Sequence, residues 1–86
     1  MPNAFIRFYA ELNDFLPAPQ RQTTSVVPIQ INTTVKHLIE SLGVPHTEID
    51  LILVNSEAVD FTYRVQDGDR ISVYPVFESL NIAPVT

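Results

Sequence analysis

Cysteine is absent from this 86-residue chain, and tryptophan is absent as well. Disulfides and a cysteine-based zinc site therefore cannot stabilise the fold, so a single hydrophobic core must do so. No cysteine nucleophile exists, and no serine lies in a Gly-x-Ser-x-Gly elbow, so we expect no catalytic residues. Only two glycines are present, Gly43 and Gly68, which is too few for a phosphate-binding loop.

Positive charge is also scarce, with five basic residues against ten acidic ones and a net charge of −5. The basic residues are scattered and never adjacent, so the sequence predicts no basic surface for phosphates or anionic membranes. We therefore expect no direct nucleic-acid binding and no membrane association. No apolar run approaches the roughly 20 residues of a membrane span, and residues 1–16 lack a signal-peptide pattern. The expected location is the cytoplasm.

Metal and cofactor sites are not indicated either. His37 and His46 are the only histidines, and no carboxylate lies at a spacing typical of a metal site. The segment Asp67-Gly68-Asp69 is too short for an EF-hand loop and lacks the later glutamate. It is typical of a tight turn before a strand, with Gly68 at positive φ. We expect no bound metal and no cofactor.

The best-supported element is a helix from about residue 35 to residue 42. Apolar residues recur at i, i+3, i+4 and i+7, which gives one buried stripe: Val35, Leu38, Ile39 and Leu42. Thr33 or Thr34 can cap its beginning, and Gly43 stands where a C′ glycine is expected. This helix is the only long one that the pattern predicts.

Strands are predicted on both sides of this helix, over residues 4–10, 26–31, 49–55 and 71–74. Residues 11–16 favour one helical turn, residues 55–57 a turn, and residues 61–65 a short extended or irregular stretch. Pro28 indicates that the second strand lies at a sheet edge. Alternation places Ile6, Phe8 and Ala10 toward the core and Phe5, Arg7 and Tyr9 on the opposite face. The expected core consists mainly of Ile6, Phe8, Val35, Leu38, Ile39, Leu42, Leu51, Leu53, Ile71 and Val73.

Three segments carry a resemblance to a known family: residues 7–16, residues 42–55 and residues 65–79. Over residues 4–82 the chain resembles the ubiquitin-like domain that precedes the Mut-seven C-terminal (PIN-like) ribonuclease domain in bacterial proteins. More distantly, it is similar to the sulfur carriers of thiamine and molybdopterin synthesis, the ThiS/MoaD type. The resemblance implies an α+β, β-grasp (ubiquitin-like) fold, a mixed sheet packed on one helix with the first and last strands adjacent. The expected domain covers residues 1–82, followed by a tail at 83–86.

The sequence departs from the sulfur carriers at their functional terminus, because those proteins end in Gly-Gly and this chain ends in residues 81–86, Asn-Ile-Ala-Pro-Val-Thr. A sulfur-carrier function is therefore the alternative. A role as an accessory domain that binds RNA is disfavoured by the net negative charge. The expected function is a non-catalytic protein-interaction module, the N-terminal adaptor or regulatory domain of a PIN-like ribonuclease protein that acts in RNA processing. Its expected partner is that ribonuclease domain, in cis or in trans.

The resemblance also suggests where a partner would bind. If the first and last strands are neighbours, their outward side chains form one surface away from the helix. The candidate interaction residues are Phe5, Arg7, Tyr9, Tyr74 and Val76, and Ser72 lies among them. The alternative is that the tail from Phe77 onward, with Leu80 and Ile82, covers this face. Tyrosine, phenylalanine and arginine are enriched in protein interfaces, which favours a partner.

Overall fold

The structure, a computed structural model, describes residues 2–76 of the chain. These residues form a single α-helix, three 3-10 helices (η) and five strands. Their order is β1 (Asn3–Phe8), η1 (Ala10–Phe15), η2 (Ala18–Gln20), β2 (Ser25–Pro28), α1 (Val35–Ser41), η3 (His46–Glu48), β3 (Ile49–Val54), β4 (Glu57–Val59) and β5 (Arg70–Pro75). The α+β class and the order of the strands and the α-helix are as the sequence predicts.

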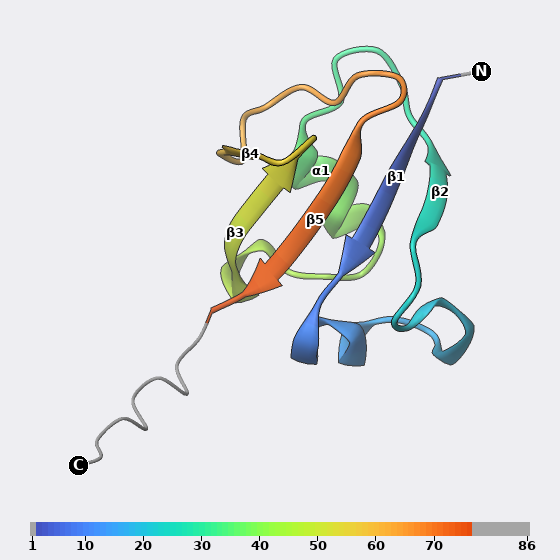
Figure 1. The fold of residues 1–86 in the computed structure, drawn as a ribbon, viewed down its shortest axis with the longest axis vertical. Helices are drawn as coiled ribbons and strands as arrows, with labels where there is room; N and C mark the ends of the chain where they lie inside the picture. Colours follow the sequence, from blue (N-terminus) through green and yellow to red (C-terminus); the bar gives the residue numbers. More distant parts are fainter. Residues whose placement is uncertain (1, 77–86) are drawn as a thin grey trace.

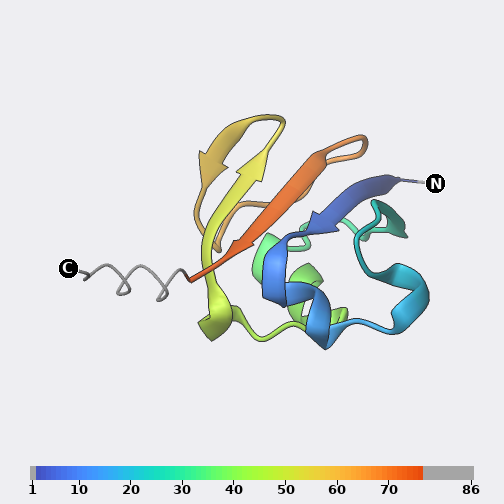
Figure 2. The ribbon, with the colours of Figure 1, turned by 60° about the horizontal axis from the view of Figure 1, so that its bottom comes forward.

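The strands form one mixed sheet in the order β2-β1-β5-β3-β4. At its centre β1 and β5 lie side by side and parallel (Figure 1), with Ile6 opposite Ile71 and Phe8 opposite Val73. The other three pairings are antiparallel, and β2, which contains Pro28, lies at one edge as predicted. The helix α1 lies on one side of the sheet only (Figure 2). A mixed sheet packed on one helix is the β-grasp arrangement.

The helix α1 begins and ends where its sequence signals lie. The Thr34 hydroxyl accepts a hydrogen bond from the backbone N–H of His37 at 3.2 Å, which satisfies a free donor of the first turn. Gly43 adopts a φ of +97° just beyond the last turn, a conformation that favours glycine. Val35 and Ile39 are fully buried against the sheet, whereas Leu42 is only partly buried.

The core extends well beyond this predicted stripe. As predicted, Ile6, Phe8, Ile71 and Val73 project from the central strands toward α1 and are buried. Further buried residues come from β1, β2, β3, η1 and the loops: Ala4, Leu12, Leu16, Val27, Ile29, Val44, Ile49, Ile52, Val54 and Val65. A chain of this size therefore uses its irregular segments as well as its regular elements to fill the core.

A buried amide fixes the segment between β1 and β2. The side chain of Asn13 donates to the carbonyl oxygens of Phe8 at 3.1 Å and Ala10 at 3.0 Å. Its oxygen accepts from the backbone N–H of Gln22 at 2.7 Å. Ala10 takes a φ of +52° as η1 begins and is exposed, so the prediction that it faces the core is wrong. The chain turns away from the sheet before Ala10 can continue the alternation of β1.

Two of the predicted core residues, Leu51 and Leu53, lie on the opposite face of the sheet. Leu51 is 38% exposed, and the buried residues of β3 are Ile49, Ile52 and Val54. The cause is an irregularity in the pairing of β3 with β5, where the register shifts between Ile49 and Leu51. One extra residue in a strand reverses the faces of every side chain that follows it. The prediction that Leu51 and Leu53 supply the core is therefore wrong.

The short strand also lies earlier than predicted. Asn55 and Ser56 have positive φ values of +52° and +75°, so they form a tight turn that returns the chain directly into β4. Residues 61–65, predicted to be extended or irregular, form an irregular segment with one isolated bridge between Thr34 and Arg64. The predicted turn before β5 is confirmed, with Gly68 at a φ of +86°.

A candidate protein-interaction face

We use the name open face for the side of the sheet away from α1. The alternating burial of β1 and β5 shows which side chains point there. The pairing places Phe5 beside Arg70, Arg7 beside Ser72, and Leu51 beside Tyr74. The open face includes Phe5 and Arg7 from β1, and Tyr9, which follows β1 directly. It also includes Arg70, Ser72 and Tyr74 from β5, Leu51 and Leu53 from β3, and Val26 from β2.

Two tyrosines stack near the C-terminal end of the central strands. The backbone N–H of Tyr9 donates to the carbonyl of Val73 at 3.0 Å, which extends the pairing of β1 and β5 by one residue. This hydrogen bond brings the rings of Tyr9 and Tyr74 into a stack, with centroids 4.6 Å apart and planes at 12°. An aromatic pair contributes about 0.5–1.5 kcal/mol beyond its buried area. The two rings therefore support each other in the free domain.

Two arginines lie on aromatic rings of the same face. The Cζ atom of Arg7 is 5.4 Å from the centroid of the Tyr9 ring, and that of Arg70 is 4.9 Å from the Phe5 ring. These distances are typical of cation–π contacts. The Nε atom of Arg7 is buried and has no hydrogen-bond partner within residues 2–76. Neither guanidinium forms an ion pair with any of these residues.

Four of the five predicted interaction residues, Phe5, Arg7, Tyr9 and Tyr74, are brought together on this face. The fifth, Val76, follows β5 and is 40% exposed. Its backbone N–H donates to the carbonyl of Glu48 at 3.1 Å, so it lies beside the end of η3. The alternative prediction, that residues from Phe77 onward cover the face, falls on residues outside the described range of the chain.

Sequence reasoning missed four residues of the open face. Arg70 shares the alternation of Ser72 and Tyr74, so the same period-2 argument could have found it. Val26 pairs directly with Phe5 and is 58% exposed, a position that only the sheet register reveals. Leu51 and Leu53 could not be found, because no residue in the sequence signals the register shift that turns them outward.

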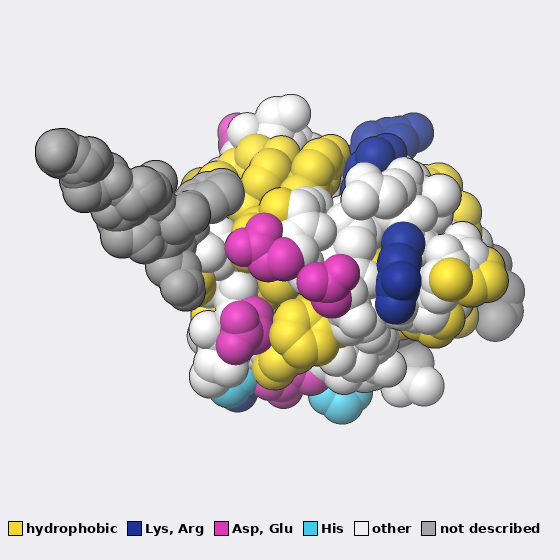
Figure 3. Space-filling model, turned by 90° about the horizontal axis from the view of Figure 1, so that it is seen from below, with side chains coloured by type: hydrophobic (Ala, Val, Ile, Leu, Met, Phe, Trp, Pro, Cys, Tyr) yellow, Lys and Arg dark blue, Asp and Glu magenta, His cyan; other side chains and the backbone are white. Residues whose placement is uncertain are grey.

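The distribution of charge differs between the open face and the lower end of the molecule. In Figure 3, which is seen from below, the open face lies along the upper rim. There hydrophobic side chains adjoin Lys and Arg side chains, and an acidic side chain is visible at the left of the rim; further acidic side chains gather on the end that faces the reader. The part of the open face around Arg7 and Arg70 is therefore apolar and cationic in a chain whose net charge is −5.

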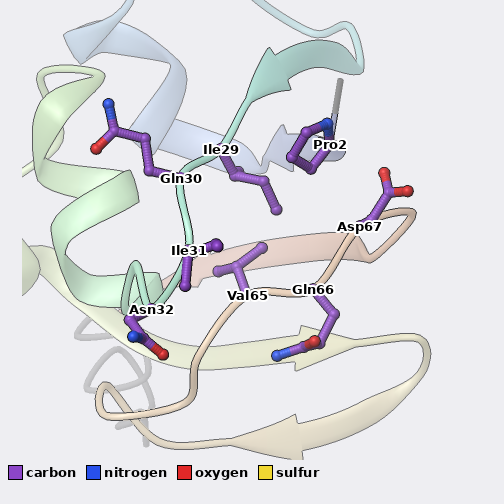
Figure 4. Close-up of a pocket in the computed structure, with 8 residues that line it drawn as sticks. All are labelled: Pro2, Ile29, Gln30, Ile31, Asn32, Val65, Gln66 and Asp67. Carbon is purple, nitrogen blue, oxygen red and sulfur yellow. The ribbon is translucent and has the colours of Figure 1, made fainter.

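A hollow of about 270 Å³ lies at the other end of the molecule, near the start of β1. It is formed between the connection from β2 to α1 and the loop before β5 (Figure 4), and Ile29, Ile31 and Val65 supply apolar walls. The only ionisable side chain there is Asp67, whose Oδ1 accepts from the backbone N–H of Asn3 at 3.0 Å. The hollow therefore has apolar walls and few polar groups that could bind a ligand.

A buried carboxylate organises the loop that leads into β5. Asp69 accepts hydrogen bonds from the Tyr63 hydroxyl at 2.7 Å, the Gln66 backbone N–H at 2.7 Å and the Asn55 amide at 3.0 Å. The hydrogen bond to this carboxylate, together with burial and its charge, raises the pKa of Tyr63 to about 12. These contacts hold the loop and do not form a reactive site.

A hydrogen bond joins the end of α1 to η3. The Nδ1 atom of His46 lies 2.5 Å from Oε2 of Glu40, and both side chains are exposed. The hydrogen bond from His46 lowers the pKa of Glu40 below its usual value. Across residues 2–76 no group of three or more His, Cys, Asp or Glu side chains is arranged to hold a metal ion. No helix within the same range is long and apolar enough to span a membrane.

Comparison with solved structures shows the class to which this fold belongs, the ubiquitin-like β-grasp proteins. Small archaeal modifier protein 1 of Haloferax volcanii is 20% identical, with a TM-score of 0.65 over 87% of this chain and 98% of the other. Urm1 of Trypanosoma brucei is 17% identical, with a TM-score of 0.66 over 90% and 94%. A protein of Pyrococcus furiosus described as a putative molybdopterin converting factor, subunit 1, is 20% identical, with a TM-score of 0.64 over 87% and 98%. At these identities the likeness shows the fold alone.

The family follows from the sequence itself. The profile of the Mut7-C ubiquitin family matches residues 1–81, so the chain belongs to this family. The comparison with curated proteins found no match. The resemblance drawn from the three sequence segments is therefore confirmed, and the chain is a ubiquitin-like module.

Proposed function

We propose that this domain is a non-catalytic adaptor that docks on a protein partner through its open face. The observation that carries the proposal is the stacked pair Tyr9 and Tyr74, surrounded by exposed apolar side chains on a face that no described element covers. A contiguous apolar patch on a small domain is typical of an interaction site. Aromatic residues and arginine are also the residue types that contribute most to binding at interfaces.

The partner we propose is a PIN-like ribonuclease domain, linked to this domain in cis or bound in trans. Membership of the Mut7-C ubiquitin family supports this partner, since the family resembles the domain that precedes such a nuclease. The adaptor comprises residues 1–82, with 83–86 as a tail, and it positions or regulates the nuclease in cytoplasmic RNA processing. The domain itself contributes no catalytic group and does not contact the RNA.

The test is a calorimetric titration of the ribonuclease domain of a Mut7-C protein with this chain. We expect the double variant Tyr9→Ala, Tyr74→Ala to bind at least about tenfold more weakly, because two central aromatic contacts are removed. The matched control is Phe15→Ala, Ile31→Ala, which removes two exposed apolar side chains outside the open face. Circular dichroism spectra must show that both variants keep the fold. Equal affinity of wild type and the tyrosine variant would rule this face out.

The structural neighbours support a second candidate, a sulfur carrier. Their descriptions include a modifier protein and a molybdopterin converting factor subunit. That chemistry requires a terminal Gly-Gly, and no glycine follows Gly68 in this sequence. The two candidates can be separated by mass spectrometry after incubation with ATP and an activating enzyme of the sulfur-carrier type. An adenylate or thiocarboxylate on the chain would favour the carrier.

A further inference from the structure

We infer that the open face selects a partner surface on which carboxylates lie among apolar side chains, and that Arg7 and Arg70 bind these carboxylates. The inference rests on the proposed function, because it specifies what the docking partner must present. It adds the basis of specificity. The tyrosines supply contact area, whereas the two arginines determine which partner surfaces bind, because they require carboxylates.

The first argument is that the two guanidinium groups are unused by the domain itself. Both lie over aromatic rings, and because Nε of Arg7 is buried, the terminal N–H groups of that guanidinium are the ones left to meet a partner. Neither guanidinium has a carboxylate partner among residues 2–76. A carboxylate is the acceptor whose two oxygens match a guanidinium.

The second argument is that the β1 and β5 positions of the face hold no carboxylate, although Asp50 lies exposed at the register shift next to Leu51. The outward positions of the face, as the sheet register gives them, include Phe5, Arg7, Tyr9, Val26, Leu51, Leu53, Arg70, Ser72 and Tyr74. A second copy of this chain is therefore a poor occupant. In a symmetric dimer the same patch meets itself, so the four arginines of two copies would have to share the two Asp50 carboxylates.

The geometry limits the spacing of the carboxylates. Arg70 lies beside Phe5 in the parallel pair, and Arg7 lies two residues further along β1. With a rise of about 3.3 Å per residue and strands about 4.8 Å apart, the two Cα atoms are roughly 8 Å apart. A single protein surface can present two carboxylates at this distance. Because long-range interactions are screened beyond about 8 Å at physiological salt, the net charge of −5 does not prevent these contact pairs.

Phosphate groups could also bind arginine, so RNA is the competing class of ligand. Two arginines without a surrounding basic surface displace few counterions, which makes RNA binding weak at physiological salt. The three aliphatic side chains of the open face, Val26, Leu51 and Leu53, also have no use in contacting a phosphate backbone. The face therefore fits an acidic protein surface better than RNA.

The experiment compares Arg7→Met and Arg70→Met with wild type in calorimetric titrations of a Mut7-C ribonuclease domain. Methionine keeps a long apolar side chain and removes only the charge and the donors. We expect each variant to bind at least about tenfold more weakly, as the loss of a charged pair at an interface does. The control Arg64→Met makes the same change in the loop before β5, where the arginine contacts Asn32, and should bind like wild type.

The outcomes separate this inference from the proposed function. If wild type binds and both methionine variants bind equally well, docking stands and the role of the arginines is overturned. If wild type does not bind the ribonuclease domain, both proposals are overturned. Binding of a single-stranded RNA oligonucleotide that either methionine variant abolishes would assign the arginines to phosphates instead. A dimer of the chain alone that the Tyr9→Ala, Tyr74→Ala variant abolishes, seen by analytical ultracentrifugation, would also overturn the inference.

Discussion

Replacing Asp69 by Asn tests whether one buried carboxylate holds the loop before β5. Asp69 is only 5% exposed and accepts three hydrogen bonds, two of them at Oδ2 from Tyr63 and Gln66 and one at Oδ1 from Asn55. An asparagine with its oxygen at the Oδ2 position keeps the first two but turns its NH₂ toward the Asn55 amide. Asn55 cannot simply rotate its amide, because its own oxygen accepts from the backbone N–H of Arg70 at 3.0 Å.

The magnitude follows from these three contacts. The NH₂ groups of the new asparagine and of Asn55 then face each other without an acceptor, which costs about 1–3 kcal/mol. The hydrogen bonds from Tyr63 and Gln66 each lose about 1 kcal/mol, because their acceptor becomes neutral. We therefore expect the free energy of unfolding to fall by about 3–5 kcal/mol. With a urea m value near about 1 kcal/mol/M for a small domain, the midpoint should fall by about 3 M or more.

The matched control is Asp67→Asn, two residues away. Asp67 carries the same charge but is exposed and accepts one hydrogen bond, from the backbone N–H of Asn3. Its substitution should change the free energy of unfolding by no more than about 1 kcal/mol. If Asp69→Asn lowers the urea midpoint no further than Asp67→Asn does, the carboxylate does not hold this loop.

Two further predictions concern the core and the loss of stability at alkaline pH. Leu38→Ala should destabilise the domain by about 2–5 kcal/mol, because it empties a buried site on α1; an unchanged denaturation midpoint would show that Leu38 does not belong to the core. The pKa of Tyr63 is raised to about 12, so the difference between the 295 nm titrations of wild type and Tyr63→Phe should be centred there. Because the folded state holds this proton more tightly, the contribution of Tyr63 is complete below about pH 10 and is lost between about 10 and 12. A difference centred near 10 would contradict this reasoning.

The sequence predicts the α-helix and the central strands because their signals are local. The apolar stripe of α1, the Thr34 cap and Gly43 all lie within one short segment, and each corresponds to a separate physical requirement. The central strands alternate cleanly, so β1 alone is enough to place Ile6 and Phe8 inside and Arg7 outside. The same alternation, read from the sequence, identifies four residues of the candidate face.

The remaining errors come from contacts that are distant in sequence. Residues 49–54 are almost entirely apolar, so alternation gives no face, and only the pairing with β5 reveals the register shift. Asn13 has no periodic signal either, since its burial depends on carbonyls and an N–H group that the folded chain brings together. The two buried polar residues among residues 2–76, Asn13 and Asp69, both fix irregular segments that periodicity cannot describe.

The register shift in β3 affects binding as well as the fold. Without it Leu51 and Leu53 would lie in the core, and Ile52 and Val54 would take their places on the open face. With it, Leu51 lies beside Tyr74, which already stacks on Tyr9. The side chains at the centre of the face are thus fixed by one another before any partner arrives. Because docking then has fewer side-chain rotamers to immobilise, more of the contact energy remains as affinity.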